Sequence, residues 1–72
     1  MEIGTKVIGK WEDWEYVGYI ASIDNSLTFP YIIAGWAYDI GKSFDQLVEQ
    51  YGLDSSDFGV FELEDLTVYK GE

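Results

Sequence analysis

Residues 16–24 read YVGYIASID, and this stretch decides the expected fold. Side chains along a strand alternate between its two faces, so the odd-numbered residues from Val17 to Ile23 form one series. The even-numbered residues from Tyr16 to Ser22 form the other. Gly18 lies inside the stretch, where a glycine often marks a bend or the close approach of another chain segment. The stretch therefore predicts a bent strand with two distinct faces.

Three further segments have the character of strands. Residues 5–9 (TKVIG) are short and β-rich, and residues 31–38 (YIIAGWAY) follow Pro30, a position where a strand tolerates proline. Residues 60–70 (VFELEDLTVYK) alternate apolar and acidic residues and are interrupted by an acidic step. We expect two short strands with a tight turn between them in that last segment.

The predicted strand over residues 31–38 carries two large aromatic residues near its end. Trp36 and Tyr38 share one face with Ile32, whereas Ile33 lies on the opposite face. The pattern does not decide which face is the interior of the sheet. We expect that either Trp36 or Tyr38 packs in the core.

One helix is expected over residues 43–51. Ser43 followed by Gln46 matches a capping box, and Gly52 is a typical C-terminal stop. Apolar residues at helical spacing form a single stripe, which consists of Phe44, Leu47, Val48 and Tyr51. A helix of two turns is too short to be stable alone in water, so this stripe should pack against the sheet.

The composition limits the chemistry available to this chain. Its 72 residues form one small domain, residues 1–72, and contain neither Cys nor His. Disulfides are therefore excluded, an ordinary structural zinc site is disfavoured, and the commonest catalytic base and the best nucleophile are missing. Residues 54–65 partly match a calcium-binding loop, but Phe58 stands where an oxygen ligand is needed. We expect no enzyme activity, no cofactor and no metal.

The net charge of the chain is strongly negative. Fourteen acids face four lysines, with no Arg, which gives −10 at pH 7. Nucleic acids and anionic membranes should be repelled, whereas a basic partner should be attracted. The same charge also favours solubility without any further role. No signal-peptide pattern or membrane-spanning apolar run is present in the sequence, so we expect a cytoplasmic, soluble protein.

The order of these elements resembles an SH3-like small β-barrel. The residues that carry the resemblance are Gly4 to Val7, Val17 to Ile20, Ile23-Asp24, Pro30 to Ile33, Phe61, Asp65-Leu66 and Val68-Tyr69. It implies a mainly β fold of five bent strands closed into a barrel, with a short helical turn before the last strand. This chain departs from the pattern in placing its helix between the third and fourth strands. It also lacks the ALYDY-like opening of proline-peptide-binding SH3 domains.

Residues 10–16 read KWEDWEY and are expected to form a loop between the first two strands. Five of these residues are candidates for partner binding: Trp11, Glu12, Asp13, Trp14 and Glu15. Aromatic rings attract cations through their faces, and carboxylates form ion pairs, so the segment suits Lys and Arg side chains. The resemblance adds that Tudor-like barrels hold methylated cations in aromatic cages and that peptide-binding SH3 domains have acids in this loop. The sequence leaves open whether the two tryptophans pack inward or stand exposed.

A second acidic group lies on and just after the predicted helix. Asp45 and Glu49 are one turn apart on its outer face, and Asp54 and Asp57 follow the helix. These acids form either an ordinary solvated face or a strip that imitates a phosphate backbone.

Taken together, these features predict a non-enzymatic module that binds a basic protein. A narrower hypothesis is a nucleic-acid mimic that inhibits a nucleic-acid-binding protein, since phage-encoded inhibitors such as anti-CRISPR proteins are similarly short and acidic. Two alternatives stay open: an assembly subunit that forms a homo-oligomer through exposed aromatics, and a reader of methylated or Arg-rich peptides.

Overall fold

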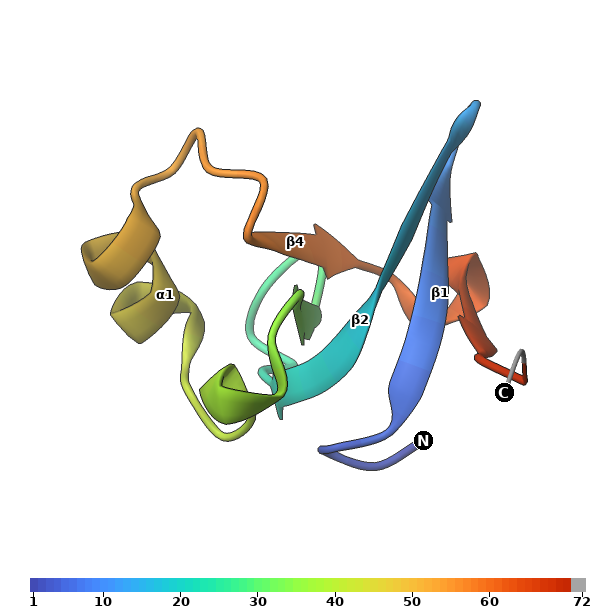
Figure 1. The fold of residues 1–72 in the computed structure, drawn as a ribbon, viewed down its shortest axis with the longest axis horizontal. Coiled ribbons are helices and arrows are strands. Elements are labelled where there is room, and N and C mark those ends of the chain that lie inside the picture. The colour runs from blue at the N-terminus through green and yellow to red at the C-terminus, as the bar shows by residue number, and fades with distance from the viewer. Residues whose placement is uncertain (71–72) are drawn as a thin grey trace.

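The computed structural model describes residues 1–70, which form one antiparallel five-stranded sheet, one α-helix and two 3₁₀ turns (Figure 1). The strands are β1 (Lys6–Trp11), β2 (Trp14–Ile23), β3 (Tyr31–Ala34), β4 (Phe58–Phe61) and β5 (Leu66–Val68). The helix is α1 (Phe44–Tyr51), and the turns are η1 (Ala37–Asp39) and η2 (Leu63–Asp65). The prediction of a mainly β chain with five strands and one helix is confirmed.

The sheet is open at both edges. Its strand order is β4-β3-β2-β1-β5, and within residues 1–70 β4 pairs only with β3 while β5 pairs only with β1. The last two strands therefore lie at opposite edges, and the turn η2 lies between them in the chain.

The central feature of the sheet is that β3 is buried on both faces. Ile32 and Ile33 are adjacent, so their side chains point to opposite faces, and both are fully buried. Ile33 belongs to a cluster with Val7, Ile20, Phe61 and Leu66. Ile32 belongs to a second cluster with Ala21, Ala34, Leu47 and Phe58. Burial on both faces explains why this strand is a continuous apolar run rather than an alternating one.

The sheet bends where β2 carries glycine and an irregular register. The pairing of β2 with β3 shifts between Ile20 and Ser22, and such bulges bend a strand and increase its twist. Gly18 lies against the backbone of Ala34, so the prediction of close approach at this glycine is confirmed. At Gly9 of β1, an added Cβ would lie 2.7 Å from the Phe61 ring, so the absence of a side chain lets that ring pack onto β1.

The helix begins and ends where the sequence predicts. The Gln46 backbone N–H donates to Ser43 Oγ at 3.1 Å, and the Ser43 backbone N–H donates to Gln46 Oε1 at 2.8 Å. Gly52 ends the helix with φ 90° and donates its N–H to the Val48 carbonyl at 2.7 Å. Leu47 is fully buried and the rest of the predicted stripe packs in the same cluster, so the expected contact between helix and sheet is confirmed.

The expectation for the end of the third strand is wrong. β3 stops at Ala34, and Gly35 donates its N–H to the Asp57 carbonyl at 2.9 Å before the chain turns into η1. Trp36 and Tyr38 consequently lie outside the sheet, 49% and 70% exposed, so neither packs in the core.

A buried carboxylate, Asp39, links η1 to the helix. It is 0% exposed and accepts hydrogen bonds from Lys42 Nζ at 2.8 Å and from the Tyr51 hydroxyl at 2.5 Å. Burial by itself would raise the pKa of Asp39, but the hydrogen bonds from Lys42 and Tyr51 outweigh it and lower that pKa. The same bond to Asp39 is the main reason that the pKa of Tyr51 is raised.

The lowered pKa of Asp39 predicts a pH-dependent contribution to stability. The unfolded chain takes up this proton first, near the ordinary Asp pKa of about 3.9, so the contribution is present above that pH. It is lost as the pH falls through the lower pKa of the folded state. We expect the stability difference between wild type and Asp39→Asn, measured by urea unfolding, to shrink as the pH falls below about 4. A difference that is constant across this range would contradict the prediction, and Asp45→Asn, an exposed carboxylate on α1, is the control.

The contact at Gly18 predicts a large cost for a single added methyl group. A Cβ at this position would lie 2.9 Å from Ile33 Cγ2 and would also overlap the Ala34 carbonyl oxygen, which is backbone and cannot move aside. We expect Gly18→Ala to lower the free energy of unfolding by about 2–3 kcal/mol. Val17→Ala, at a 44% exposed neighbour, should cost less than about 1 kcal/mol. Equal midpoints of chemical denaturation for the two variants would contradict this account.

Candidate functional site

Residues 10–16 form the end of a β-hairpin rather than a loop. Trp11 and Trp14 are the last pair of the β1–β2 ladder, which leaves only Glu12 and Asp13 as the turn. The expectation of a longer loop is therefore wrong, because β1 continues through Trp11 and β2 already begins at Trp14. Figure 1 shows this hairpin extending away from the rest of the molecule.

The turn has an unusual backbone. Glu12 has φ 53°, the only positive φ of a non-glycine residue in the part of the chain described. This left-handed region is disfavoured for residues with a Cβ, and glycine, Asn or Asp is the usual choice there. The sequence accordingly holds a glutamate where turn stability alone would favour glycine.

The structure answers whether the two tryptophans pack inward. Trp11 is 49% exposed, and its ring meets the Phe29 ring edge-on with centroids 6.0 Å apart. Trp14 is 70% exposed. Both lie on the face of the hairpin that carries Tyr16, which packs on the core, but they extend beyond that core. Trp11 is thus half-buried by its contact with Phe29, whereas Trp14 is largely exposed to solvent.

The carboxylates at the hairpin end are exposed, and three of the four lysines, Lys6, Lys10 and Lys42, have partners other than Glu12 and Asp13. Lys10 Nζ lies 3.6 Å from Glu15, an exposed pair that contributes little to stability. Lys42 is bound to Asp39, and Lys6 Nζ lies over the Tyr69 ring, 4.4 Å from its centroid. No salt bridge to Glu12 or Asp13 occurs within residues 1–70. We call the five residues Trp11, Glu12, Asp13, Trp14 and Glu15 the hairpin tip.

The second acidic group is divided between helix and loop. Asp45 and Glu49 are exposed on α1, and Asp54 is exposed just after it. Asp57 has internal partners instead: its carboxylate accepts from Trp36 Nε1 at 3.0 Å and from Ser55 Oγ at 3.0 Å. Figure 1 shows α1 and the hairpin tip on opposite sides of the molecule, so the candidate residues do not form one cluster. A phosphate-like array stays a prediction.

Tyr16 connects the hairpin to the loop that carries Asp57. Its hydroxyl donates to the Ser56 carbonyl at 2.9 Å, and its ring stacks on Phe61 with centroids 6.2 Å apart. Burial, together with the negative charge of Asp57, raises the pKa of Tyr16 to about 12. Tyr16, which pairs with Gly9, thereby holds the hairpin against the loop that precedes β4.

Two features of the surface were missed at the sequence level. Trp36 and Tyr38 stack in parallel, with centroids 5.9 Å apart and planes 5° apart, and the hydrogen bond to Asp57 fixes the indole of Trp36. Gly35, which precedes them, was the available signal that the strand ends.

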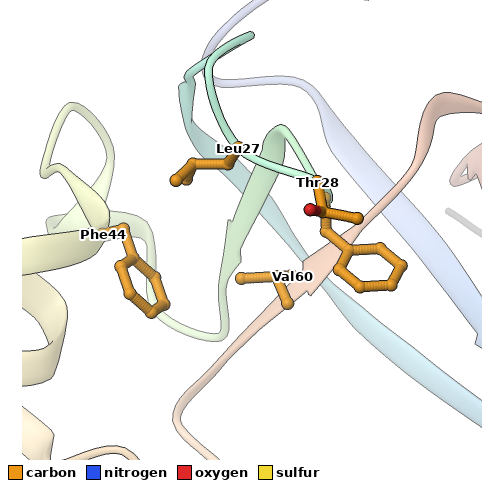
Figure 2. Close-up of a pocket in the computed structure, with 5 residues that line it drawn as sticks. Leu27, Thr28, Phe44 and Val60 are labelled. Carbon is orange, nitrogen blue, oxygen red and sulfur yellow. The ribbon is translucent and has the colours of Figure 1, made fainter.

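The second missed feature is a shallow apolar pocket of about 190 Å³ (Figure 2). It is lined by Leu27, Thr28, Phe29, Phe44 and Val60. These residues come from three separate parts of the chain, so no local pattern could have predicted the pocket.

No family model, no curated protein and no solved structure matches this chain. Within residues 1–70, no helix combines the length and apolar character needed to cross a membrane. Over the same residues, no group of three or more Asp or Glu side chains is placed to hold a metal ion.

The positive φ of Glu12 predicts that this residue costs stability. Glycine adopts such a conformation without penalty, so Glu12→Gly should raise the free energy of unfolding by about 1 kcal/mol. Asp13→Gly removes the same charge from the same turn at a position without positive φ, and should lower stability by about 0.5 kcal/mol. Urea denaturation midpoints check both variants. Destabilisation by both would show that the turn carries no strain at Glu12.

Proposed function

We propose that this chain is a non-enzymatic protein-binding module with an SH3-like fold. Five antiparallel strands with a 3₁₀ turn before the last one support the fold assignment, since the sequence resemblance implies five strands and a short helical turn at this place. The packing of the β1–β2 hairpin over Phe61 also supports it, because this contact curls the open sheet toward a barrel.

The proposed partner is a basic protein segment, and the proposed binding surface is the hairpin tip. The observation that carries the proposal is the exposure of Trp14, 70% in solvent, directly beside a two-residue acidic turn. A small domain with a limited core gains stability by burying a large indole, so an exposed one is informative. An indole face and nearby carboxylates together attract Lys and Arg side chains.

The strained turn supports the same surface. Glu12 keeps a carboxylate in a conformation that favours glycine, and strained residues concentrate at binding sites. Lys10 is paired with Glu15, Lys42 is paired with Asp39, and Lys6 lies over the Tyr69 ring. The negative charge of Glu12 and Asp13 is therefore available to a partner.

Net charge argues against the homo-oligomer as an alternative. Two copies would each bring −10 to an interface, and like-charge repulsion opposes close approach. The narrower hypothesis, inhibition of a nucleic-acid-binding protein, stays a prediction. The present proposal requires only that the partner segment be cationic.

The proposal predicts that a short oligolysine peptide binds at the hairpin tip. Titration at low ionic strength should change the tryptophan fluorescence, and the affinity should fall steeply as salt is added. Glu12→Gln with Asp13→Asn should weaken binding about tenfold, which corresponds to about 1.4 kcal/mol.

The matched control removes the same number of acids from the helix, as Asp45→Asn with Glu49→Gln. This variant should bind with an affinity close to that of wild type. Equal weakening in the two double variants would mean that the peptide senses only the overall charge, and the proposed site would then be wrong.

A further inference from the structure

The apolar pocket is continuous with the hairpin tip through one side chain. Phe29 lines the pocket and also meets the Trp11 ring edge-on, with centroids 6.0 Å apart. An apolar surface therefore extends from Val60 and Phe44, across Phe29, to the half-exposed Trp11. The acidic turn follows directly after it.

The pocket borders an edge strand. Val60 lies in β4, which pairs only with β3 among residues 1–70. An edge strand presents backbone donors and acceptors that an extended peptide can use, and its side-chain pockets give specificity. A ligand lying there would be extended, with one side chain directed into the pocket.

Charge complementarity selects the ligand. The pocket wall is apolar except for the Thr28 hydroxyl, so it suits an aliphatic or aromatic side chain. The chain around it carries −10, and the exposed carboxylates of Glu12 and Asp13 follow Trp11. An apolar residue alone fits the pocket but does not use the negative charge around it. A lysine-rich segment without an apolar residue fits the charge but leaves the pocket empty.

We propose that this pocket is the anchor site for one apolar residue of a cationic, extended partner segment. The anchor occupies the space between Phe29, Phe44 and Val60, and the flanking Lys or Arg residues extend over Trp11 to the hairpin tip. This inference rests on the proposed function, because it assigns the sequence chemistry of the same basic partner.

Two synthetic peptides test the inference: a short lysine-rich peptide that carries one leucine, and the same peptide with glycine in place of leucine. The wild-type protein should bind the leucine peptide about tenfold more tightly, a modest gain because the pocket is shallow. Thr28→Phe fills the pocket from an exposed position, so this variant should lose the preference and bind the two peptides with about equal affinity. Its affinity for the glycine peptide should stay that of wild type, which also shows that the variant is folded.

Thr67→Phe is the matched control. It places the same new side chain at an exposed position of β5, at the opposite edge of the sheet, and should keep the preference for leucine. Equal binding of both peptides by wild type, or a preference that survives Thr28→Phe, would overturn the anchor site and leave the proposed function intact. Failure of both peptides to bind would overturn both the anchor site and the proposed function. A wild-type dimer in sedimentation that Thr28→Phe dissociates would show that the occupant is a second copy, and would also overturn the inference.

Discussion

The strand β3 is buried on both faces, and this burial determines how the helix and the β1–β2 hairpin are placed. Ile32 and Ile33 are both fully buried, and their side chains point to opposite faces of the sheet. Other parts of the chain must therefore pack against each face of β3. On one face, α1 supplies Leu47. On the other, the β1–β2 hairpin bends across, and Gly9 and Gly18 make this possible by leaving room for the Phe61 ring and the Ala34 backbone. The capped helix and the bent hairpin thus cover the two faces of β3.

This arrangement also determines which side chains reach solvent. The two clusters are filled mainly by aliphatic residues with Phe58 and Phe61, and the hairpin is longer than the core that it covers. Trp14 therefore extends past the packed region, while Trp11 is half-covered by Phe29. Exposed aromatic surface beside unpaired carboxylates follows from how the sheet is covered. The same geometry places the hairpin tip next to the apolar pocket, through the contact between Trp11 and Phe29.

The helix and most strands could be predicted from the sequence because their signals are local. Ser43, Gln46 and Gly52 fixed both helix ends, and alternation located β2. The end of β3 was predicted wrongly, because Gly35 was a weak local signal and the hydrogen bond that fixes this end joins Gly35 to Asp57, far apart in the sequence. Asp39 was missed for the same reason, because its partners include Tyr51 on the helix. The residues of the hairpin tip could be chosen from the sequence. The partial burial of Trp11 could not be predicted, because it depends on contact with Phe29. The pocket could not be predicted either, because three separate segments of the chain line it.

We propose that the hairpin tip, rather than the overall acidity of the chain, recognises a cationic partner. The most direct measurement is a titration of isotope-labelled protein with oligolysine, followed residue by residue through backbone amide shifts in NMR spectra. We expect the largest changes at Glu12, Asp13 and Trp14 and in the indole N–H signals of Trp11 and Trp14. Changes centred on Asp45 and Glu49, or spread evenly over all exposed acids, would contradict it.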